Sequence, residues 1–393
     1  MPWGILASAS FLIFAVITPQ LCIPPLEHII KEELGISHTQ TSLLVTTPLI
    51  VIAALSIPAG LLADRTGIRK AAGIGAIFVM AGAISRGFSD NFSILLLETL
   101  LIGIGSALVL PNLPKMVSLW VPKGKAGVAT GIYSTGMGVG SALAVAITPS
   151  LIYPVTHTFQ GALLIWSIPI IIATIVWWTV VSDPAPAATS SKPENSGVAP
   201  LRLLSSNRSI WFIAFLFFLG QFYYFNWTTW SPALMMERGA SAELAALIAS
   251  VVSWISIPTF LLVPRLSLKL GVRKPFLWIP PIIMAFAALW ALYITVAMGW
   301  PLMALVGICY NVLFVIALAL PVEIMPRETV GTASGLIMSI GFSGGVIGPL
   351  IGGYILDITG SLNNSLLVLI GVATVAAIIG FQIPETGPGI SKK

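Results

Sequence analysis

Apolar stretches of about 20 residues recur along the whole chain, and each is long enough to cross the hydrocarbon core of a bilayer as a helix. Of the 393 residues, 57% are hydrophobic and 8% are charged, and the mean hydropathy is +0.99. The stretches are continuously apolar rather than alternating, which favours helices over a membrane β-barrel. Hydropathy predicts twelve spans, at roughly 4–24, 41–63, 70–88, 93–119, 126–151, 160–182, 209–232, 242–265, 275–297, 300–324, 330–357 and 363–384.

The chain also repeats itself at an offset of 204 residues. Residues 60–70 read Gly-Leu-Leu-Ala-Asp-Arg-Thr-Gly-Ile-Arg-Lys, and residues 264–274 read Pro-Arg-Leu-Ser-Leu-Lys-Leu-Gly-Val-Arg-Lys. The same offset aligns 120–132 with 324–336 and 33–37 with 237–241. An internal repeat of apolar helices is typical of transporters. We therefore predict an all-α membrane protein of two pseudo-symmetric six-helix bundles, 1–182 and 209–393, joined by a cytoplasmic Pro- and Ser-rich linker at 183–208.

The distribution of Lys and Arg predicts the orientation of the chain. With both termini inside, fifteen of these residues lie on the inner side, and only Lys31, Arg86 and Arg238 lie outside. This bias predicts a multi-pass protein of the cytoplasmic membrane with both termini in the cytoplasm. The net charge of +5 is then an orientation signal and an attraction for anionic lipid, not the mark of a nucleic-acid partner.

The loop at 60–70 carries a resemblance to a known family. Gly60, Asp64, Arg65, Gly67, Arg69 and Lys70 match the loop 2–3 signature of the major facilitator superfamily. The resemblance implies two six-helix bundles around a central cavity, which rock to expose that cavity to each side in turn. Within the superfamily, residues 109–135 are similar to the cyanate permease and nitroimidazole transporter group.

Two departures from the family pattern limit what the resemblance implies. Many proton-coupled members have an Arg in helix 4 where this chain has Thr99, which puts their arginine-centred coupling in doubt here. Drug antiporters have Gly-Pro late in helix 5, where this chain has Ala144-Val145. The antiporter inference therefore does not transfer.

The resemblance implies that the 60–70 loop is a latch that favours the outward-open state. Gly60 lets helices approach closely, and we expect the Asp64 carboxylate to face the positive N-terminal end of span 330–357, near Thr332. The basic residues of the loop either pair with carboxylates or only anchor it on the inner side. The matching residue in the second copy is Leu268, so only the first half has this carboxylate. The gating candidates are Gly60, Asp64, Arg65, Gly67, Arg69, Lys70, Glu323, Arg327, Gly344, Gly348 and Pro349.

In the family, helices 1, 4, 7 and 10 line the cavity. Polar and aromatic residues on these helices, and one at the start of helix 5, are therefore the candidates for binding a substrate. The Gln and Asn residues have an alternative role in interhelical hydrogen bonding, and the Tyr and Trp residues, Trp227 especially, have one in an outer aromatic belt. The candidates are Gln20, Asn112, Lys115, Tyr133, Gln221, Tyr223, Tyr224, Asn226, Trp227, Tyr310 and Asn311.

Charges inside the spans are few, and each is therefore informative. Lys115 either attracts a substrate anion or extends to the inner surface. Glu98 either carries a coupled proton or is a solvated carboxylate at the outer end of its helix. Glu323 is expected to be an ion-pair partner at the inner gate.

These features predict a secondary transporter, with uptake of a small anion or polar organic solute and a co-transported proton, and with efflux of lipophilic compounds as the alternative. No phosphate-binding loop, metal cluster or cofactor motif is found in the sequence, and we expect no cofactor and a monomer. The segment Gly341-Phe-Ser-Gly matches intramembrane serine proteases, but all three histidines fall in predicted outer loops, so the catalytic base is missing. We therefore do not expect an enzyme.

Overall fold

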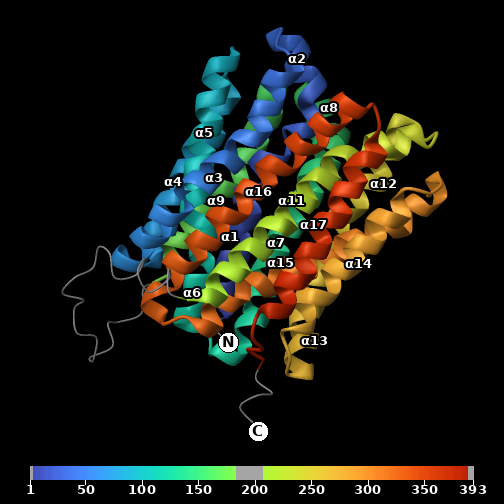
Figure 1. Cartoon of the computed structure of the whole chain (residues 1–393). Coiled ribbons are helices and arrows are strands. Elements are labelled where there is room, and N and C mark those ends of the chain that lie inside the picture. Colours follow the sequence, from blue (N-terminus) through green and yellow to red (C-terminus); the bar gives the residue numbers. More distant parts are fainter. Residues whose placement is uncertain (1–2, 183–206, 388–393) are drawn as a thin grey trace.

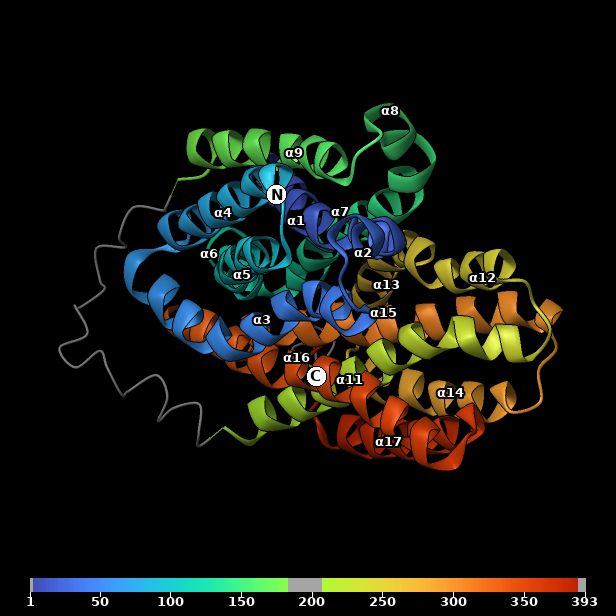
Figure 2. The same cartoon turned by 90° about the horizontal axis from the view of Figure 1, so that it is seen from above.

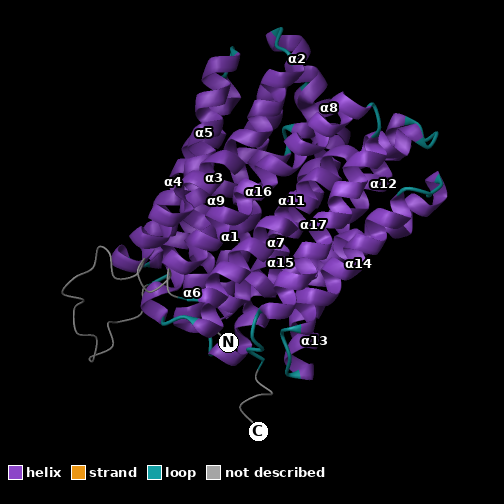
Figure 3. Ribbon diagram, in the orientation of Figure 1, coloured by secondary structure: helices purple, strands orange, loops and turns teal. Residues whose placement is uncertain are grey.

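The computed structural model describes residues 3–182 and 207–387, and within these ranges all regular elements are helices (Figures 1 and 3). In this part of the chain, eleven helical stretches are long and apolar enough to span a membrane. A twelfth apolar helix, Pro275–Ala291, is shorter. The all-α fold class is therefore confirmed, although the predicted span 275–297 ends early.

The long helices of the first half are α1 (Trp3–Leu21), α3 (His38–Thr66), α4 (Ile68–Ser85), α5 (Phe92–Val109), α7 (Ala126–Ile147) and α9 (Phe159–Val180). Short helices join them: η1 (Pro24–Leu26), α2 (Glu27–Leu34), η2 (Arg86–Phe88), η3 (Leu110–Asn112), α6 (Leu113–Trp120), η4 (Lys123–Lys125), η5 (Thr148–Ile152) and α8 (Tyr153–Thr156). The second half contains α11 (Arg208–Glu237), α12 (Ala242–Trp254), α13 (Ser256–Leu270), α14 (Pro275–Ala291), η6 (Val296–Met298), α15 (Gly299–Ile324), η7 (Arg327–Thr329), α16 (Val330–Thr359) and α17 (Leu362–Gln382).

Two predicted spans are interrupted. The span at 93–119 consists of α5, η3 and α6, because Pro111 and Pro114 lack the N–H groups that an unbroken α-helix needs. The span at 242–265 is divided into α12 and α13 at Ile255. Pro258 follows in the first turn of α13, where a missing N–H is tolerated.

The sequence repeat reappears as a repeated helix contact. A β-carbon on Gly335 of α16 would lie 2.3 Å from the backbone oxygen of Ser56 in α3, and one on Gly131 of α7 would lie 2.1 Å from that of Phe260 in α13. The two glycines differ by 204 positions (335 − 131), and so do their partners (260 − 56). Only glycine permits so close an approach. The pairs α3–α16 and α7–α13 are thus equivalent interfaces between the two parts of the chain.

A second repeated contact lies within each half. A β-carbon on Gly140 would meet the backbone of Phe14 in α1, and one on Gly344 would meet that of Phe218 in α11. These pairs are again 204 positions apart. In Figure 2 the helices coloured blue to green lie on one side and those coloured yellow to red on the other, with α3 beside α16 and α7 beside α13.

The first turns of α16 pack on α3. Gly331 and Gly335 of α16 pack on α3, and Ser339 donates to the Ala53 oxygen. Further along, Gly344 and Gly348 pack on α11 instead. We call the end at which α3 meets the start of α16 the basic end, because it carries the loops at 65–70 and 269–274. α1 begins and α17 ends there as well (Figure 1).

The predicted linker at 183–208 lies outside the described residues except for its last two. Of these, Asn207 caps α11, because its side chain accepts the backbone N–H of Ser209. The predicted division of the chain at this linker therefore stays a prediction.

Candidate functional site

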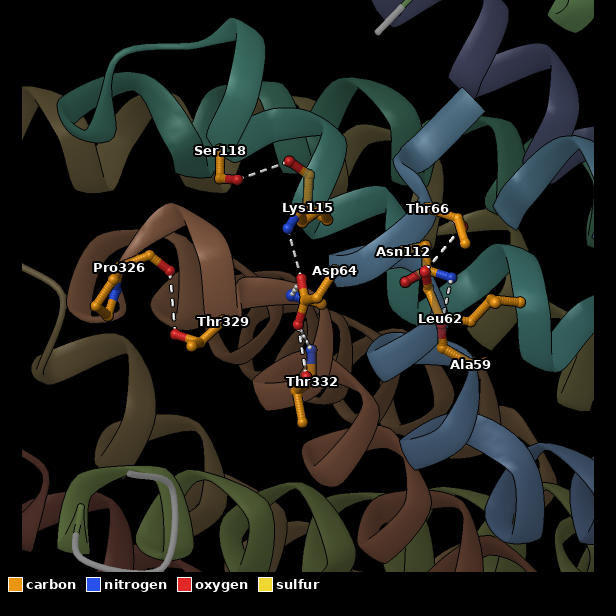
Figure 4. A network of polar contacts seen from close by, with 11 residues as sticks. Ala59, Leu62, Asp64, Thr66, Asn112, Lys115, Ser118, Pro326, Thr329 and Thr332 are labelled. Carbon is orange, nitrogen blue, oxygen red and sulfur yellow. Dashed lines mark hydrogen bonds and ion pairs between the residues drawn. The ribbon is translucent and has the colours of Figure 1, made fainter. Parts of the chain in front are cut away.

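Asp64, near the end of α3, binds the first turn of α16. Its Oδ1 accepts the backbone N–H of Gly331 at 3.1 Å, and its Oδ2 accepts the N–H and the hydroxyl of Thr332 at 2.7 and 2.5 Å (Figure 4). The free N–H groups and the dipole at a helix N-terminus favour a negative charge. The contact with Thr332 is the one expected from the sequence.

The helices can meet here because two glycines face each other. A β-carbon on Gly60 would lie 2.2 Å from the Gly331 oxygen, and one on Gly331 would lie 2.6 Å from Asp64 Oδ1. Either side chain would push α3 and α16 apart. These close approaches therefore give the carboxylate its position.

Lys115 is the third partner of Asp64. Its Nζ lies 2.5 Å from Asp64 Oδ1, and the two side chains are only 7% and 6% exposed. The ammonium does not extend to the inner surface in this structure, because Asp64 holds it, and the role in attracting a substrate anion stays a prediction. Asp64 is 51 positions earlier in the chain, and no local pattern indicated the pairing.

The basic residues of the first loop lie in different surroundings. Arg69 donates to the backbone oxygen of Trp178 at 2.7 Å and lies over its indole ring. The indole N–H of Trp177 in turn donates to the Arg69 oxygen. Gly67 takes a φ of 87°, which glycine adopts most easily, and Arg65 is exposed. The loop is thus held against α9.

In the second copy of the loop, Arg273 is completely buried, 204 positions after Arg69. It donates to Glu323 Oε1 from Nη2 at 2.9 Å and from Nε at 3.1 Å. Thr386 donates to the same carboxylate at 3.0 Å. Lys123 reaches the backbone oxygen of Glu323 from the other half at 3.4 Å. Glu323 thus belongs to a charged network at the basic end, while Arg327 is exposed.

Three of the predicted substrate residues come together between α11 and α15. The Tyr310 hydroxyl donates to Gln221 Oε1, and the ring of Tyr310 stacks on that of Tyr224 with centroids 3.8 Å apart. Gln221 and Tyr310 are buried, while Tyr224 is half-buried. A stacked aromatic pair beside an amide is suited to a small, partly polar ligand. We call these three residues the aromatic–amide cluster.

Four other candidates of the second half bond to other groups of the protein. Tyr223 donates to the Met284 oxygen of α14, and Trp227 contacts Met303 of α15. Asn226 binds the Gly348 oxygen and accepts from Ser365, and it lines a small cavity between α11 and α17. Asn311 donates to Gly307 in its own helix. Of these contacts, those of Asn226 are the interhelical bonds that were its alternative role, and the substrate role of all four residues stays a prediction.

Three candidates of the first half are distributed over three helical segments. Gln20 donates to Ser106 of α5 at 3.0 Å and is half-buried. Asn112 donates to the Ala59 oxygen of α3, but its own Oδ1 has no hydrogen-bond partner. Tyr133 is buried, and its hydroxyl also lacks a partner.

Arg86 and Glu98 do not lie where the sequence suggested. Arg86, expected in an outer loop, is 1% exposed and donates to the Pro19 oxygen at 2.6 Å and to the Thr99 hydroxyl at 2.5 Å. Glu98 is buried rather than solvated, and it accepts a hydrogen bond from Ser89. A short turn after α4 folds Arg86 back between α1 and α5, which hydropathy does not predict.

Many apolar helices joined by short turns, with the same contacts repeated in both halves, define a multi-pass membrane protein. Residues 5–349 match the Major Facilitator Superfamily, and the chain belongs to this family. This confirms the resemblance found in the 60–70 loop.

Relatives and solved structures agree with this assignment. The chain is 25% identical to the hexuronate transporter of Bacillus subtilis (strain 168), covering 91% of this chain and 89% of that protein. It is 23% identical to the cyanate transport protein CynX of Escherichia coli (strain K12), covering 86% of each. The crystal structure of the transporter FucP in the outward conformation superposes with a TM-score of 0.78 at 16% identity, covering 95% of this chain and 97% of that one.

These relatives are transporters rather than enzymes, so the protein is a secondary transporter and the protease alternative is wrong. In agreement, Ser343 of the Gly341-Phe-Ser-Gly segment donates to the backbone oxygen of Ile340.

Proposed function

We propose that this protein takes up a small anion or polar organic solute across the cytoplasmic membrane by rocking its two halves. The basic end is the cytoplasmic side and both termini lie there, in keeping with the excess of Lys and Arg at that end. The transporter works as a monomer.

The observation that carries this proposal is the division of α16 between two partners. At the basic end α16 is bound to α3 through Asp64, and further along it packs on α11. Loss of the first contact leaves the second intact, so the two halves can separate at this end without unfolding. That is the motion which alternating access requires.

The substrate class follows from the relatives and from the polar groups on the expected cavity helices. Hexuronate and cyanate are both anions, and the relatives are named for them. In this chain the aromatic–amide cluster supplies hydrogen bonds and stacking, Gln20 adds an amide on α1, and Lys115 supplies positive charge nearer the basic end. Efflux of lipophilic compounds would need no such charge.

Proton coupling is the part of the proposal that rests on Glu98. A carboxylate buried in a transporter can change its charge as the two halves move. The buried Arg86, which bonds to the neighbouring Thr99, adds a positive charge to the same region. We propose that Glu98 takes up the coupled proton.

Purified protein in proteoliposomes tests the proposal directly. A thermal-shift screen against cyanate, glucuronate, neutral sugars and lipophilic drugs identifies which class stabilises the protein. Flux of each hit is then measured with and without an inward pH gradient. Gradient-driven accumulation of an anion supports the proposal, whereas stabilisation and outward movement of drugs alone would establish efflux instead.

A further inference from the structure

Several polar groups near the basic end are buried without hydrogen-bond partners. They are the hydroxyls of Thr130 and Ser134 on α7, the hydroxyl of Ser334 on α16 and the amide oxygen of Asn112 in η3, and none of these residues is more than 1% exposed. Burying a polar atom without a partner is unfavourable. These atoms gain water or a ligand as partners only if the helix contacts around them open.

The hydroxyls lack partners although a partner lies within their own helix. Thr99 donates to the backbone oxygen of Leu95 one turn earlier, as many Ser and Thr residues of this structure do. The Thr130 hydroxyl instead lies near that of Tyr133, without hydrogen-bonding geometry. The hydroxyls of Thr130, Ser134 and Ser334 therefore do not make the bond within their own helix that Thr99 makes.

Thr130 and Ser334 occupy equivalent positions of the repeat, 204 residues apart. Each directly precedes the glycine, Gly131 or Gly335, that packs on the opposite half. The two unpartnered hydroxyls thus lie beside the two contacts that close the basic end. Separation of those contacts would expose both hydroxyls at once.

Lys115 belongs to the same region. The segment that carries it, α6, packs against α7, α15 and α16, and the facing part of α15 from Cys309 to Val322 is buried on every side. Its ammonium is held by Asp64 between α6 and the start of α16 (Figure 4). Asp64 also binds the first turn of α16. The same carboxylate therefore holds both Lys115 and the α3–α16 contact at the basic end.

We propose that Lys115, Thr130, Ser134 and Ser334 form an exit site for a carboxylate or similar oxyanion, which is closed in this structure and opens when α16 leaves α3. The unpartnered amide oxygen of Asn112 is an acceptor and is not a ligand of the anion. This inference rests on the proposed function, which it deepens. The ammonium and the hydroxyls donate hydrogen bonds to the oxygens of the departing anion. Because the anion competes with Asp64 for Lys115, its arrival weakens the hold of Asp64 on the basic end.

Cysteine labelling tests this site. Thr130→Cys, Ser134→Cys and Ser334→Cys are each made in the full chain and in the variant Thr332→Val, which removes one hydrogen bond to Asp64. A membrane-impermeant thiol reagent is applied to either face of membrane vesicles. Cys22 and Cys309 are buried, so the unsubstituted chain supplies the baseline. Ser167→Cys on α9 is the matched control, because Ser167 is also buried but bonds within its helix.

The proposal predicts that Thr332→Val raises labelling of the three cysteines about tenfold, from the basic face only, and leaves Ser167→Cys unlabelled. It also predicts that glucuronate slows this labelling and that Lys115→Gln abolishes the slowing. Asp64→Asn provides a second way to open the end if Thr332→Val has too small an effect.

Three results would overturn the proposal. If neither variant raises the labelling of the three cysteines, these residues do not line the route by which the anion leaves. Raised labelling that neither glucuronate nor cyanate slows would leave no anion site, and slowing that survives Lys115→Gln would exclude Lys115. Failure of the proposed function is distinguishable, because it appears as absence of anion flux and of anion-dependent thermal stabilisation in the unsubstituted protein.

Discussion

Lys115 Nζ lies 2.5 Å from Asp64 Oδ1, and both side chains are buried. The same carboxylate accepts two backbone N–H groups and a hydroxyl from the first turn of α16. One acidic group thus joins α3, α6 and α16 at the basic end. A buried charge of this kind is costly unless all its partners are in place, so small changes here have large effects.

Replacement of Asp64 by Asn keeps the shape of the side chain but removes its charge. Charge-assisted hydrogen bonds are roughly twice as strong as neutral ones, so the hold on α16 weakens. We expect uptake in proteoliposomes to fall by about tenfold because the open basic end becomes more populated. Asp90→Asn, in an exposed loop, is the control and should transport normally. Normal uptake by Asp64→Asn would show that the carboxylate does not act as a latch.

The Asp64–Lys115 pair should show strong energetic coupling. Removing one partner of a buried pair leaves the other charge unpaired, and Lys115→Gln should lower the free energy of unfolding by about 3 kcal/mol. The double variant Asp64→Asn, Lys115→Gln should be more stable than the sum of the single effects predicts. Reversible unfolding in mixed micelles measures this cycle. Additive effects would mean that the two side chains do not stabilise each other.

The two equivalent glycine contacts should respond alike to an added methyl group. Gly131→Ala and Gly335→Ala each place a β-carbon against a backbone oxygen of the opposite half, which forces the helices apart. Spin labels on Lys70 and Lys269, both exposed at the basic end, should report a longer distance in either variant. Gly371→Ala on α17 has open space for its methyl group and should leave the distance unchanged. An unchanged distance in both variants would contradict a closure that depends on these contacts.

Neighbouring tyrosines on α11 and α15 should have different roles. Tyr310→Phe removes the donor to Gln221 in the aromatic–amide cluster, and we expect a higher KM for the transported solute together with about 1 kcal/mol lower stability. Tyr223→Phe removes the bond to the Met284 oxygen, and we expect about 1 kcal/mol lower stability with an unchanged KM. The opposite pattern would place the substrate on the α14 side of α11.

Glu98→Gln should separate substrate movement from proton coupling. If Glu98 takes up the proton, the variant still exchanges labelled for unlabelled substrate but no longer accumulates it in response to a pH gradient. Asp90→Asn again serves as the control. Full accumulation by Glu98→Gln would remove this residue from the coupling step.

The sequence alone predicted the twelve apolar helices, their repeat at 204 residues and the end at which the basic loops gather. These are local properties, because hydropathy and charge are read along the chain without knowledge of neighbours. The contact of Asp64 with Thr332 was also predicted from the sequence. The 60–70 loop carries an acidic side chain, and the N-terminus of an α-helix favours a negative charge.

The spacing of the polar and aromatic residues along α11 also contains information about the site. Successive residues of an α-helix are turned by about 100°, so Gln221 and Tyr224 share one face while Tyr223, Asn226 and Trp227 share another. This spacing separates the two groups. It does not say which neighbouring helices each face meets, because that depends on the rotation of α11 against its neighbours.

Only the tertiary structure decided the partners of the buried charges. Lys115 pairs with Asp64, Arg86 turns inward to Thr99, and Arg273 binds Glu323. Each contact joins segments that are apart in the chain, and each buried charge lies where oppositely charged or polar atoms of other helices lower the cost of burial. The order of residues determined which segments cross the membrane, and the packing of those segments determined which charges meet.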